Sequence, residues 1–235
     1  MLRKRTMLAS LIEDGGGNDA NCILLLHLDN NRTNASSSGI TVSQYNSIPF
    51  TTTYKKFGTH ALNCTSAYYY LSSSTAINNA LTNEITVDYW IKVNQSATDQ
   101  YNMGYAADFS FGGSGGKAAL CVVTYIGRFI CTGWANGDVN FLIDIPYTWG
   151  SGFNHVAVVI KGGTVKAFIN GILVGSTVTI LSLPISETIH RIAGGYSTMH
   201  YTGGGLSTTN VIDEFRISNC ARWTKNFTPP TSAYI

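Results

Sequence analysis

The sequence predicts an all-β fold in which two antiparallel sheets pack face to face as a sandwich. Charged residues make up only 12% of the 235 residues, about half of the usual ~25%, so the Glu-, Lys- and Arg-rich surfaces typical of helices are missing. Aromatic residues and turn formers are plentiful, with 13 Tyr and 24 Gly. No long apolar stripe with a helical period runs between capping residues. A length of 235 residues suits one large β domain.

Short apolar runs and alternating patterns mark the predicted strands. Residues 22–28 are nearly all apolar, which indicates a strand buried on both faces. Residues 85–93 alternate between apolar and polar side chains, which predicts a half-buried strand. Residues 155–179 predict three strands, joined by turns at Gly162-Gly163 and at Asn170-Gly171, a dipeptide typical of type I′ hairpins. The other predicted elements are strands at 118–124, 129–134, 141–145 and 211–217 and a helical turn at 74–81.

The chain divides into an arm with a Gly-rich linker, residues 1–20, and a sandwich domain, residues 21–235. The arm carries the basic cluster Arg3, Lys4 and Arg5, which is either a solvated tail or an anchor on an acidic partner surface. A net charge of +2 is too small to indicate nucleic acid or a membrane surface as the main partner. The N-terminus lacks a signal-peptide pattern, and no apolar run is long enough to span a membrane.

The five cysteines, at widely spaced positions, are expected to be free buried thiols of a protein made in a reducing cytoplasm. Their spacing contains no Cys-x-x-Cys pair, which argues against a zinc ribbon. A disulfide between Cys121 and Cys131 across a hairpin stays open as an alternative. Catalysis is not expected, because none of the four Glu residues belongs to the paired carboxylates that glycoside hydrolysis needs. The glycine run 112–116 predicts a hairpin loop rather than a nucleophile elbow or a phosphate loop, since no helix pattern follows it.

An inward-facing acid is the first candidate binding feature. In the strand 211–217, alternation places Asp213 on the face of Val211, Phe215 and Ile217, where a carboxylate is costly unless it is paired or bound to a cation. Asp29 follows the other strongly apolar strand, and hard oxygen ligands suit Ca²⁺. One interpretation is therefore a structural Ca²⁺ held by Asp29, Asp213 and backbone carbonyls. The other is an aspartate bonded to loop amides or to a nearby arginine.

Aromatic residues beside Gly, Asn and Ser are the second candidate feature. Sugar faces stack on aromatic rings, while amides bind the hydroxyl groups. The alternative is packing at the edge of the core. The candidate carbohydrate-binding residues are Trp134, Tyr147, Trp149, Tyr196 and Tyr201.

Six short segments in this order and spacing resemble the laminin-G-like or pentraxin-like concanavalin A superfamily. They are Leu24–Asp29, Lys56–Leu62, Ile85–Ile91, His155–Val158, Phe168–Gly171 and Ile212–Ile217. The resemblance implies a jelly-roll sandwich, with Asp213 helping to hold a structural Ca²⁺. The ending Ala221–Pro230 resembles versions of this domain found in tailed bacteriophages.

That resemblance implies a non-enzymatic virion protein, made in the host cytoplasm and displayed as a tail or head fibre or as a capsid decoration. Its partners would be capsid or tail subunits, contacted through the arm, and a host-surface glycan; a homo-oligomer is compatible with this role. Two alternatives stay open. One is a purely structural cement protein without a ligand site, and the other is a carbohydrate-binding module of a bacterial surface. Fold alone does not decide among them.

Overall fold

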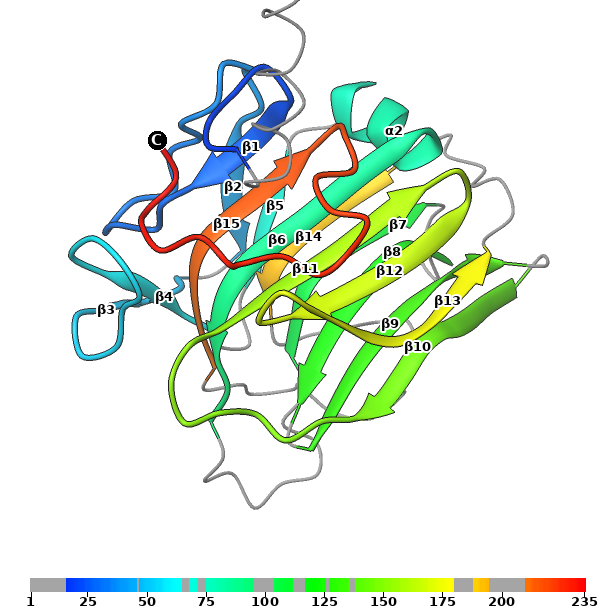
Figure 1. Cartoon of the computed structure of the whole chain (residues 1–235). Helices are drawn as coiled ribbons and strands as arrows, with labels where there is room; N and C mark the ends of the chain where they lie inside the picture. The colour runs from blue at the N-terminus through cyan, green and yellow to red at the C-terminus, as the bar shows by residue number, and fades with distance from the viewer. Residues whose placement is uncertain are drawn as a thin grey trace, which may run out of the picture.

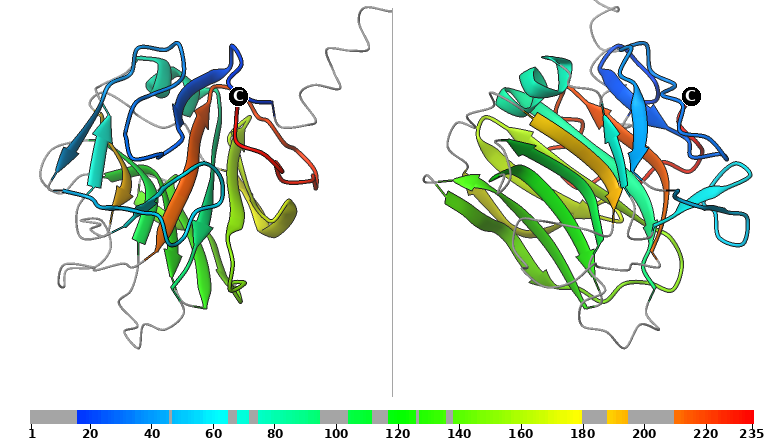
Figure 2. Two further views of the ribbon diagram at one scale, coloured as in Figure 1. Left: turned by 90° about the vertical axis from the view of Figure 1, so that its left-hand side faces the viewer. Right: turned by 180° about the vertical axis from the view of Figure 1, so that it is seen from behind.

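The computed structural model describes residues 16–45, 47–64, 68–71, 75–94, 104–111, 117–125, 127–135, 138–179, 188–194 and 210–235. They form two antiparallel sheets, which lie as two layers in Figure 1 and in the rotated views of Figure 2. This confirms the predicted sandwich. The single described helix, α2 (Thr75–Thr82), occupies the predicted helical turn and packs Ile77 and Leu81 into the core.

Sheet A has eight strands in the order β13-β12-β11-β6-β15-β4-β3, with β1 also paired to β15. Its strands are β1 (Cys22–Leu26), β3 (Phe50–Thr51), β4 (Ala61–Asn63), β6 (Glu84–Lys92), β11 (Asn154–Lys161), β12 (Thr164–Ile169), β13 (Ile172–Thr179) and β15 (Val211–Ser218).

Sheet B has seven strands in the order β10-β9-β8-β7-β14-β5-β2. They are β2 (Val42–Tyr45), β5 (Tyr68–Leu71), β7 (Gly104–Phe111), β8 (Lys117–Tyr125), β9 (Arg128–Ala135), β10 (Asp138–Pro146) and β14 (Thr188–Gly194). The prediction placed β1, β6, β8 to β13 and β15 but missed the short strands β2 to β5 and the strands β7 and β14.

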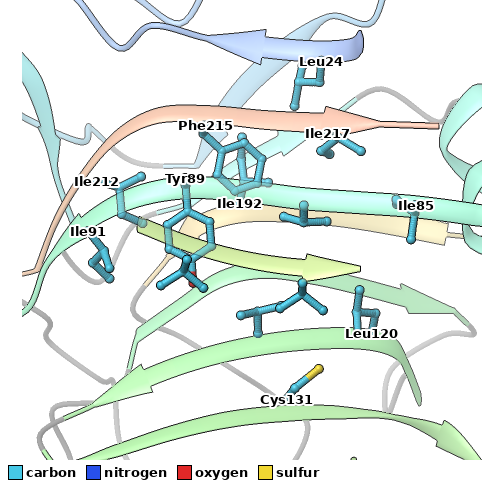
Figure 3. Packing of buried hydrophobic residues seen from close by; sticks show 14 of the residues in the cluster. Leu24, Ile85, Tyr89, Ile91, Leu120, Cys131, Ile192, Ile212, Phe215 and Ile217 are labelled. Atoms are coloured by element: carbon cyan, nitrogen blue, oxygen red, sulfur yellow. The ribbon is translucent and has the colours of Figure 1, made fainter. Parts of the chain in front are cut away.

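The core lies between the two sheets. In Figure 3, Tyr89, Ile91 and Phe215 of sheet A lie in the same core as Leu120 and Ile192 of sheet B. The rings of Tyr89 and Phe215 stack at 5.8 Å between centroids. The large buried apolar surface of these side chains is the main stabilising contribution to such a fold.

The predicted hairpin at Asn170-Gly171 is present, with φ of 51° and 78° at its two central residues. Both values are positive, as a type I′ turn requires. A Cβ on Gly171 would lie 1.9 Å from the carbonyl oxygen of Phe227, and the Phe227 amide donates a hydrogen bond to the Gly171 carbonyl at 2.9 Å. The glycine therefore serves both the turn and the close approach of the C-terminal segment.

Four cysteines, Cys22, Cys64, Cys131 and Cys220, are free, and all but Cys220 are buried. Because Cys131 is free and lies opposite Val122 rather than Cys121, no disulfide crosses the β8–β9 hairpin. Burial raises the pKa of the Cys131 thiol to about 12, so this thiol is unreactive at neutral pH.

The C-terminal segment, residues 219–235, crosses the outer face of sheet A (Figure 1). Its Trp223 and Phe227 rings stack at 4.0 Å and pack with Ala157 and Phe168 of the sheet. Strand β6 is consequently buried on both faces. The alternation of residues 85–93 predicted a half-buried strand. That prediction is wrong, because protein rather than water covers the polar face of the strand.

A buried ion pair lies under the C-terminal segment. The Arg216 guanidinium donates two hydrogen bonds to the Asp88 carboxylate, both at 3.0 Å, and both side chains are 0% exposed. The Tyr234 hydroxyl also donates to Asp88, and His155 Nε2 lies 3.4 Å from the same carboxylate. Burial alone would raise the pKa of Asp88, but the charges and hydrogen bonds of Arg216 and His155 together outweigh it and hold the pKa well below its usual range. Paired charges make this burial tolerable.

Residues 16–19 lie against the sandwich. Arg216 Nη1 donates to the carbonyls of Gly16 and Gly17 at 2.7 and 3.2 Å, and the Asp19 carboxylate binds the Arg222 guanidinium at 2.9 and 3.0 Å. These contacts place residues 16–19 with the folded domain rather than with the arm. The predicted anchor residues Arg3, Lys4 and Arg5 lie outside the described residues.

Candidate functional site

The outer face of sheet A is open at one end. There, Lys92 of β6, Val211 of β15 and Asn63 of β4 lie side by side across three paired strands. The preceding row, Ile91 and Ile212, points into the core, and side chains alternate along a strand. The row that contains Lys92 therefore points away from the core.

The loop 52–60, which joins β3 to β4, folds over this outer face and is fixed by two carboxylates. The amides of Lys56 and Phe57 donate to Asp213 Oδ2 at 2.6 and 3.1 Å. The amides of Thr59 and His60 donate to Asp29 Oδ1 at 2.6 and 2.9 Å. Charge-assisted bonds of this kind are among the stronger hydrogen bonds in proteins, so the loop has a defined position on the sheet.

Gly58 allows the loop to approach Asp29. Its φ is +57°, and a Cβ at this position would lie 2.1 Å from Asp29 Oδ2. Only glycine adopts this backbone conformation without strain. Two rings add to the docking, because Phe57 packs edge-on against Trp90 at 5.9 Å and the Lys56 ammonium lies 4.0 Å from the Trp90 ring centre.

A β-bulge at Glu214 determines which way Asp213 points. Asp213 lies opposite Trp90 and Arg216 opposite Asp88, so two residues of β15 face one residue of β6, and Glu214 has a φ of +50°. The bulge reverses the alternation, so Phe215 enters the core while Asp213 lies on the outer side, under the loop. The predicted common face of Asp213 and Phe215 is therefore wrong. Burial raises the pKa of Asp213 to about 7.

The contacts of Asp29 and Asp213 in this arrangement are hydrogen bonds. Three N–H or O–H donors point at Asp29 Oδ1, and both oxygens of Asp213 accept backbone amides. Among the described residues, no group of three or more His, Cys, Asp or Glu side chains is arranged to hold a metal ion. Of the two interpretations from sequence, the contacts match hydrogen bonding to loop amides.

The loop and the outward row enclose a pocket of about 330 Å³, here called the Tyr54 pocket. Its lining consists of Thr51, Thr53, Tyr54, Asn63, Lys92, Asn94 and Val211. The Tyr54 side chain is 48% exposed, and the Lys92 ammonium lies 4.5 Å from its ring centre. An exposed ring beside hydroxyl, amide and ammonium groups suits a small polar ligand with an apolar face.

Sequence reasoning missed this pocket. The candidate rings were those beside Gly, Asn and Ser, whereas Tyr54 follows the three threonines at 51–53. The available signal was the basic-aromatic run Tyr54-Lys55-Lys56, together with Lys92 on the polar face of the alternating segment. Only the pairing of β15 with β4 and β6 shows that these segments meet.

Of the predicted carbohydrate-binding residues, Tyr147 and Trp149 lie together, but Trp149 belongs to the core. Trp149 is 4% exposed, lies 6.5 Å from Phe129 and donates from Nε1 to the Arg128 carbonyl at 3.3 Å, so its ring faces are covered by the core. Tyr147 is half-buried beside it, at 4.8 Å between ring centres. The Trp134 backbone belongs to β9, but its side chain lies outside the described part.

Tyr196 and Tyr201 lie outside the described residues as well. Among the described residues, no helix is long and apolar enough to cross a membrane.

Comparison with known proteins places the chain in a family. A family model for the concanavalin A-like lectin/glucanases superfamily matches residues 63–225, more than half of the chain. The chain therefore belongs to this superfamily, as the sequence resemblance predicted. A search of the curated proteins finds no match.

Solved structures similar to this chain include binding domains of bacterial toxins. The botulinum neurotoxin serotype D binding domain has a TM-score of 0.62 at 16% identity, over 87% of this chain and 49% of that one. The binding domain of Paraclostridial Mosquitocidal Protein 1 gives 0.62 at 13% identity, over 86% and 49%. A botulinum neurotoxin type C structure gives 0.58 at 16%, over 87% and 49%. The chain spans about half the length of these chains, and at such identities the likeness shows the fold.

Proposed function

We propose that this member of the concanavalin A-like lectin/glucanases superfamily is a non-enzymatic binding domain that holds a glycan in the Tyr54 pocket. The observation that carries the proposal is the exposed Tyr54 ring, which a fixed loop presents beside Asn63, Asn94 and Lys92. A sugar ring offers an apolar C–H face to the tyrosine and hydroxyl groups to the amides. Because Asp213 and Asp29 fix the loop before a ligand arrives, little ordering cost is left for binding.

The similar structures are consistent with this proposal. Cell entry of botulinum neurotoxin type C depends on interaction with two ganglioside molecules, and a botulinum neurotoxin DC binding domain forms a complex with SialylT. These ligands belong to those proteins. They support a binding role for a related fold, while the residues of the Tyr54 pocket supply the argument for this chain.

Hydrolysis of the bound glycan is disfavoured by the lining of the pocket. Glycoside hydrolysis generally needs two carboxyl groups on either side of the scissile bond, and the described lining contains no Asp or Glu. The nearby Glu214 is buried and bonded to His27 Nδ1 at 3.0 Å, and Asp213 accepts loop amides. The nearest acids therefore support the structure of the loop and the sheet.

The binding test uses a glycan array with the wild-type chain, Tyr54→Ala and Tyr54→Phe. We expect Tyr54→Ala to lose at least tenfold in affinity for the glycans that the wild type binds, because the stacking face is removed. Tyr54→Phe keeps the ring and should retain most of the binding. Ile172→Ala, at another exposed apolar side chain on β13, is the control and should bind as the wild type does. Unchanged binding by Tyr54→Ala would refute this site.

The wider role that we propose is display on a bacteriophage particle as a tail fibre, head fibre or capsid decoration. It is supported by the resemblance of Ala221–Pro230 to phage versions of the domain. The arrangement of the two ends agrees with a tethered domain, because the Asn18 amide donates to the Ile235 carbonyl at 2.9 Å. Both ends of the described chain thus lie side by side, so one attachment point can hold the domain.

Deletion of residues 1–15 tests the attachment, since residues 16–19 contribute to the fold. We expect the shortened domain to keep its melting temperature and glycan binding but to be absent from assembled particles. Incorporation of the shortened chain at the wild-type level would contradict an anchoring role for Arg3, Lys4 and Arg5. A full-length chain that binds no glycan yet assembles normally would favour the structural cement alternative.

A further inference from the structure

The charge around the Tyr54 pocket is one-sided. Lys92 belongs to the lining, and Lys55 and Lys56 lie on the loop that forms one wall of the pocket. No acidic residue occurs among the described lining residues. Lys92 is the one charged residue of the described lining, and its ammonium group gives the pocket a local positive potential, which favours an anionic ligand.

The described acids Asp29, Asp213 and Glu214 are already engaged. Asp213 and Asp29 accept hydrogen bonds from the amides of the loop. The Glu214 carboxylate is hydrogen-bonded to His27 Nδ1 at 3.0 Å and accepts the Tyr234 amide at 3.2 Å. Among the described residues, none of these carboxylates forms a salt bridge with Lys92. None of the described carboxylates thus neutralises the ammonium group of Lys92, and an anion from outside the chain would supply the missing counter-charge.

A second lysine, near the opposite end of β6, has a different arrangement. There, Lys161 of β11 lies opposite Glu84 of β6, and the two side chains form a salt bridge at 3.2 Å. Lys161 and Lys92 thus stand near the two ends of β6 with the same charge. One of them is neutralised by a partner on the neighbouring strand, and the other has an aromatic ring as its neighbour.

The position of Lys92 is set by the strand and by Tyr54. Its neighbours Ile91 and Val93 are buried in the core, so the backbone of Lys92 is fixed. Its ammonium lies 4.5 Å from the Tyr54 ring centre, within the range of a cation–π contact. The pocket therefore presents a cation and a half-exposed aromatic ring close together, and a ligand that uses both must carry an anionic group beside an apolar face.

We propose that the glycan in the Tyr54 pocket carries an acidic sugar residue, and that Lys92 binds its anionic group while Tyr54 contacts the sugar ring. This inference rests on the glycan-binding function proposed above and adds the chemical class of the ligand. Asn63 and Thr53 lie in the lining where their side chains can bond to hydroxyl groups. A volume of about 330 Å³ suits one or two sugar residues.

The shared chemistry is an anion on a sugar ring, which either a carboxylate or a sulfate ester supplies. The probes are therefore three matched sets of oligosaccharides on one array: chains that end in a sialic acid or uronic acid, the same chains with a sulfated hexose, and the same chains with a neutral hexose. Binding is measured at about 50 and 300 mM salt, since a lysine–anion contact weakens as screening increases.

Lys92→Gln is the decisive variant, and Lys161→Gln is its matched control because it removes the same charge from β11, beside the other end of β6. We expect the wild type to prefer one acidic set over the neutral set by about tenfold, as a charge-assisted hydrogen bond warrants. Lys92→Gln should reduce that ratio to about one, because the acidic set loses its anion contact. Lys161→Gln should keep the wild-type ratio, and Lys92→Arg should keep most of it.

Three results would overturn the inference. An equal response of the wild type to acidic and neutral sets, with binding still lost in Tyr54→Ala, would leave the glycan site standing and refute the acidic ligand alone. A preference for acidic sugars that survives in Lys92→Gln would place the selectivity elsewhere. Binding of none of the three sets would contradict both this inference and the proposed function.

Discussion

The outer face of sheet A has a covered part and an open part, although the same strands β6 and β15 form both. In the covered part, Asp88 and Arg216 are paired, are 0% exposed and lie under the C-terminal segment. In the open part, a few residues further along the same strands, Lys92 and Val211 line a pocket beside the exposed Tyr54. The difference shows that the cover, and not the strand itself, decides whether a charged side chain supports the fold or remains available to a ligand.

Two separate segments produce this division. The C-terminal segment brings Tyr234 onto Asp88 and Arg216, with the guanidinium 3.8 Å from the Tyr234 ring centre. The loop 52–60 covers Trp90 and Asp213 and ends the covered part at Tyr54. Removal of a charge should therefore reduce stability in one part and ligand binding in the other.

The largest expected effect is at the buried pair. Arg216→Ala leaves the Asp88 carboxylate buried without its partner, and we expect the free energy of unfolding to fall by about 3–5 kcal/mol. Urea denaturation followed by tryptophan fluorescence measures it. Lys161→Ala breaks the partly exposed pair with Glu84 and should cost about 0–1 kcal/mol. Equal losses in the two variants would contradict the distinction between covered and open charges.

A smaller effect is expected where the loop meets Asp29. Gly58→Ala places a methyl group against the Asp29 carboxylate at a positive φ, which should lower the stability by about 1–2 kcal/mol. The displaced loop should also weaken glycan binding, although Tyr54 and Lys92 are unchanged. Gly39→Ala is a control at a φ of +74° with open space around the added Cβ. Glycan binding by Gly58→Ala at the wild-type level would show that loop position is irrelevant.

The smallest expected effect on stability depends on pH and involves His27. Its hydrogen bond to Glu214 raises the His27 pKa, against the opposing effect of burial. A raised folded-state pKa stabilises the fold fully below the unfolded value of about 6.5, and the contribution is lost as pH rises through the folded value. We expect His27→Gln to cost about 0.5–1 kcal/mol at pH 5.5, since the ring is one-third exposed.

At pH 8.5 the stability difference between His27→Gln and the wild type should be smaller. Chemical denaturation of both proteins at the two pH values measures the change. A stability difference that grows with pH would contradict the pairing of a protonated His27 with Glu214.

Local patterns in the sequence predicted much of the fold. The dipeptide Asn170-Gly171 by itself favours a type I′ turn, and the alternation of residues 85–93 by itself indicates a strand. Neither prediction needs information from distant residues. The short strands β3 and β4 have two and three residues, too few for a period to appear. Strand β4 forms because β15 supplies its partner, and β3 pairs with β4 in turn, which only the tertiary structure shows.

The site was harder to predict because it depends on a bulge and on a docked loop. Simple alternation put Asp213 in the core with Phe215, but one additional residue at Glu214 reverses the faces. Trp149, which the pattern of rings beside Gly and Asn favoured as a sugar platform, is buried. Tyr54 is exposed because a loop fixed by carboxylates 25 or more residues away in sequence holds it there.

The most direct test of the open part as a ligand site is a paired measurement on Tyr54→Ala and the wild type. Isothermal titration with the best glycan of the array gives the affinity, and thermal unfolding of the same samples gives the stability. The account predicts an affinity loss of at least tenfold with stability changed by no more than about 0.5 kcal/mol. Equal affinities, or a loss of affinity accompanied by a comparable loss of stability, would contradict it.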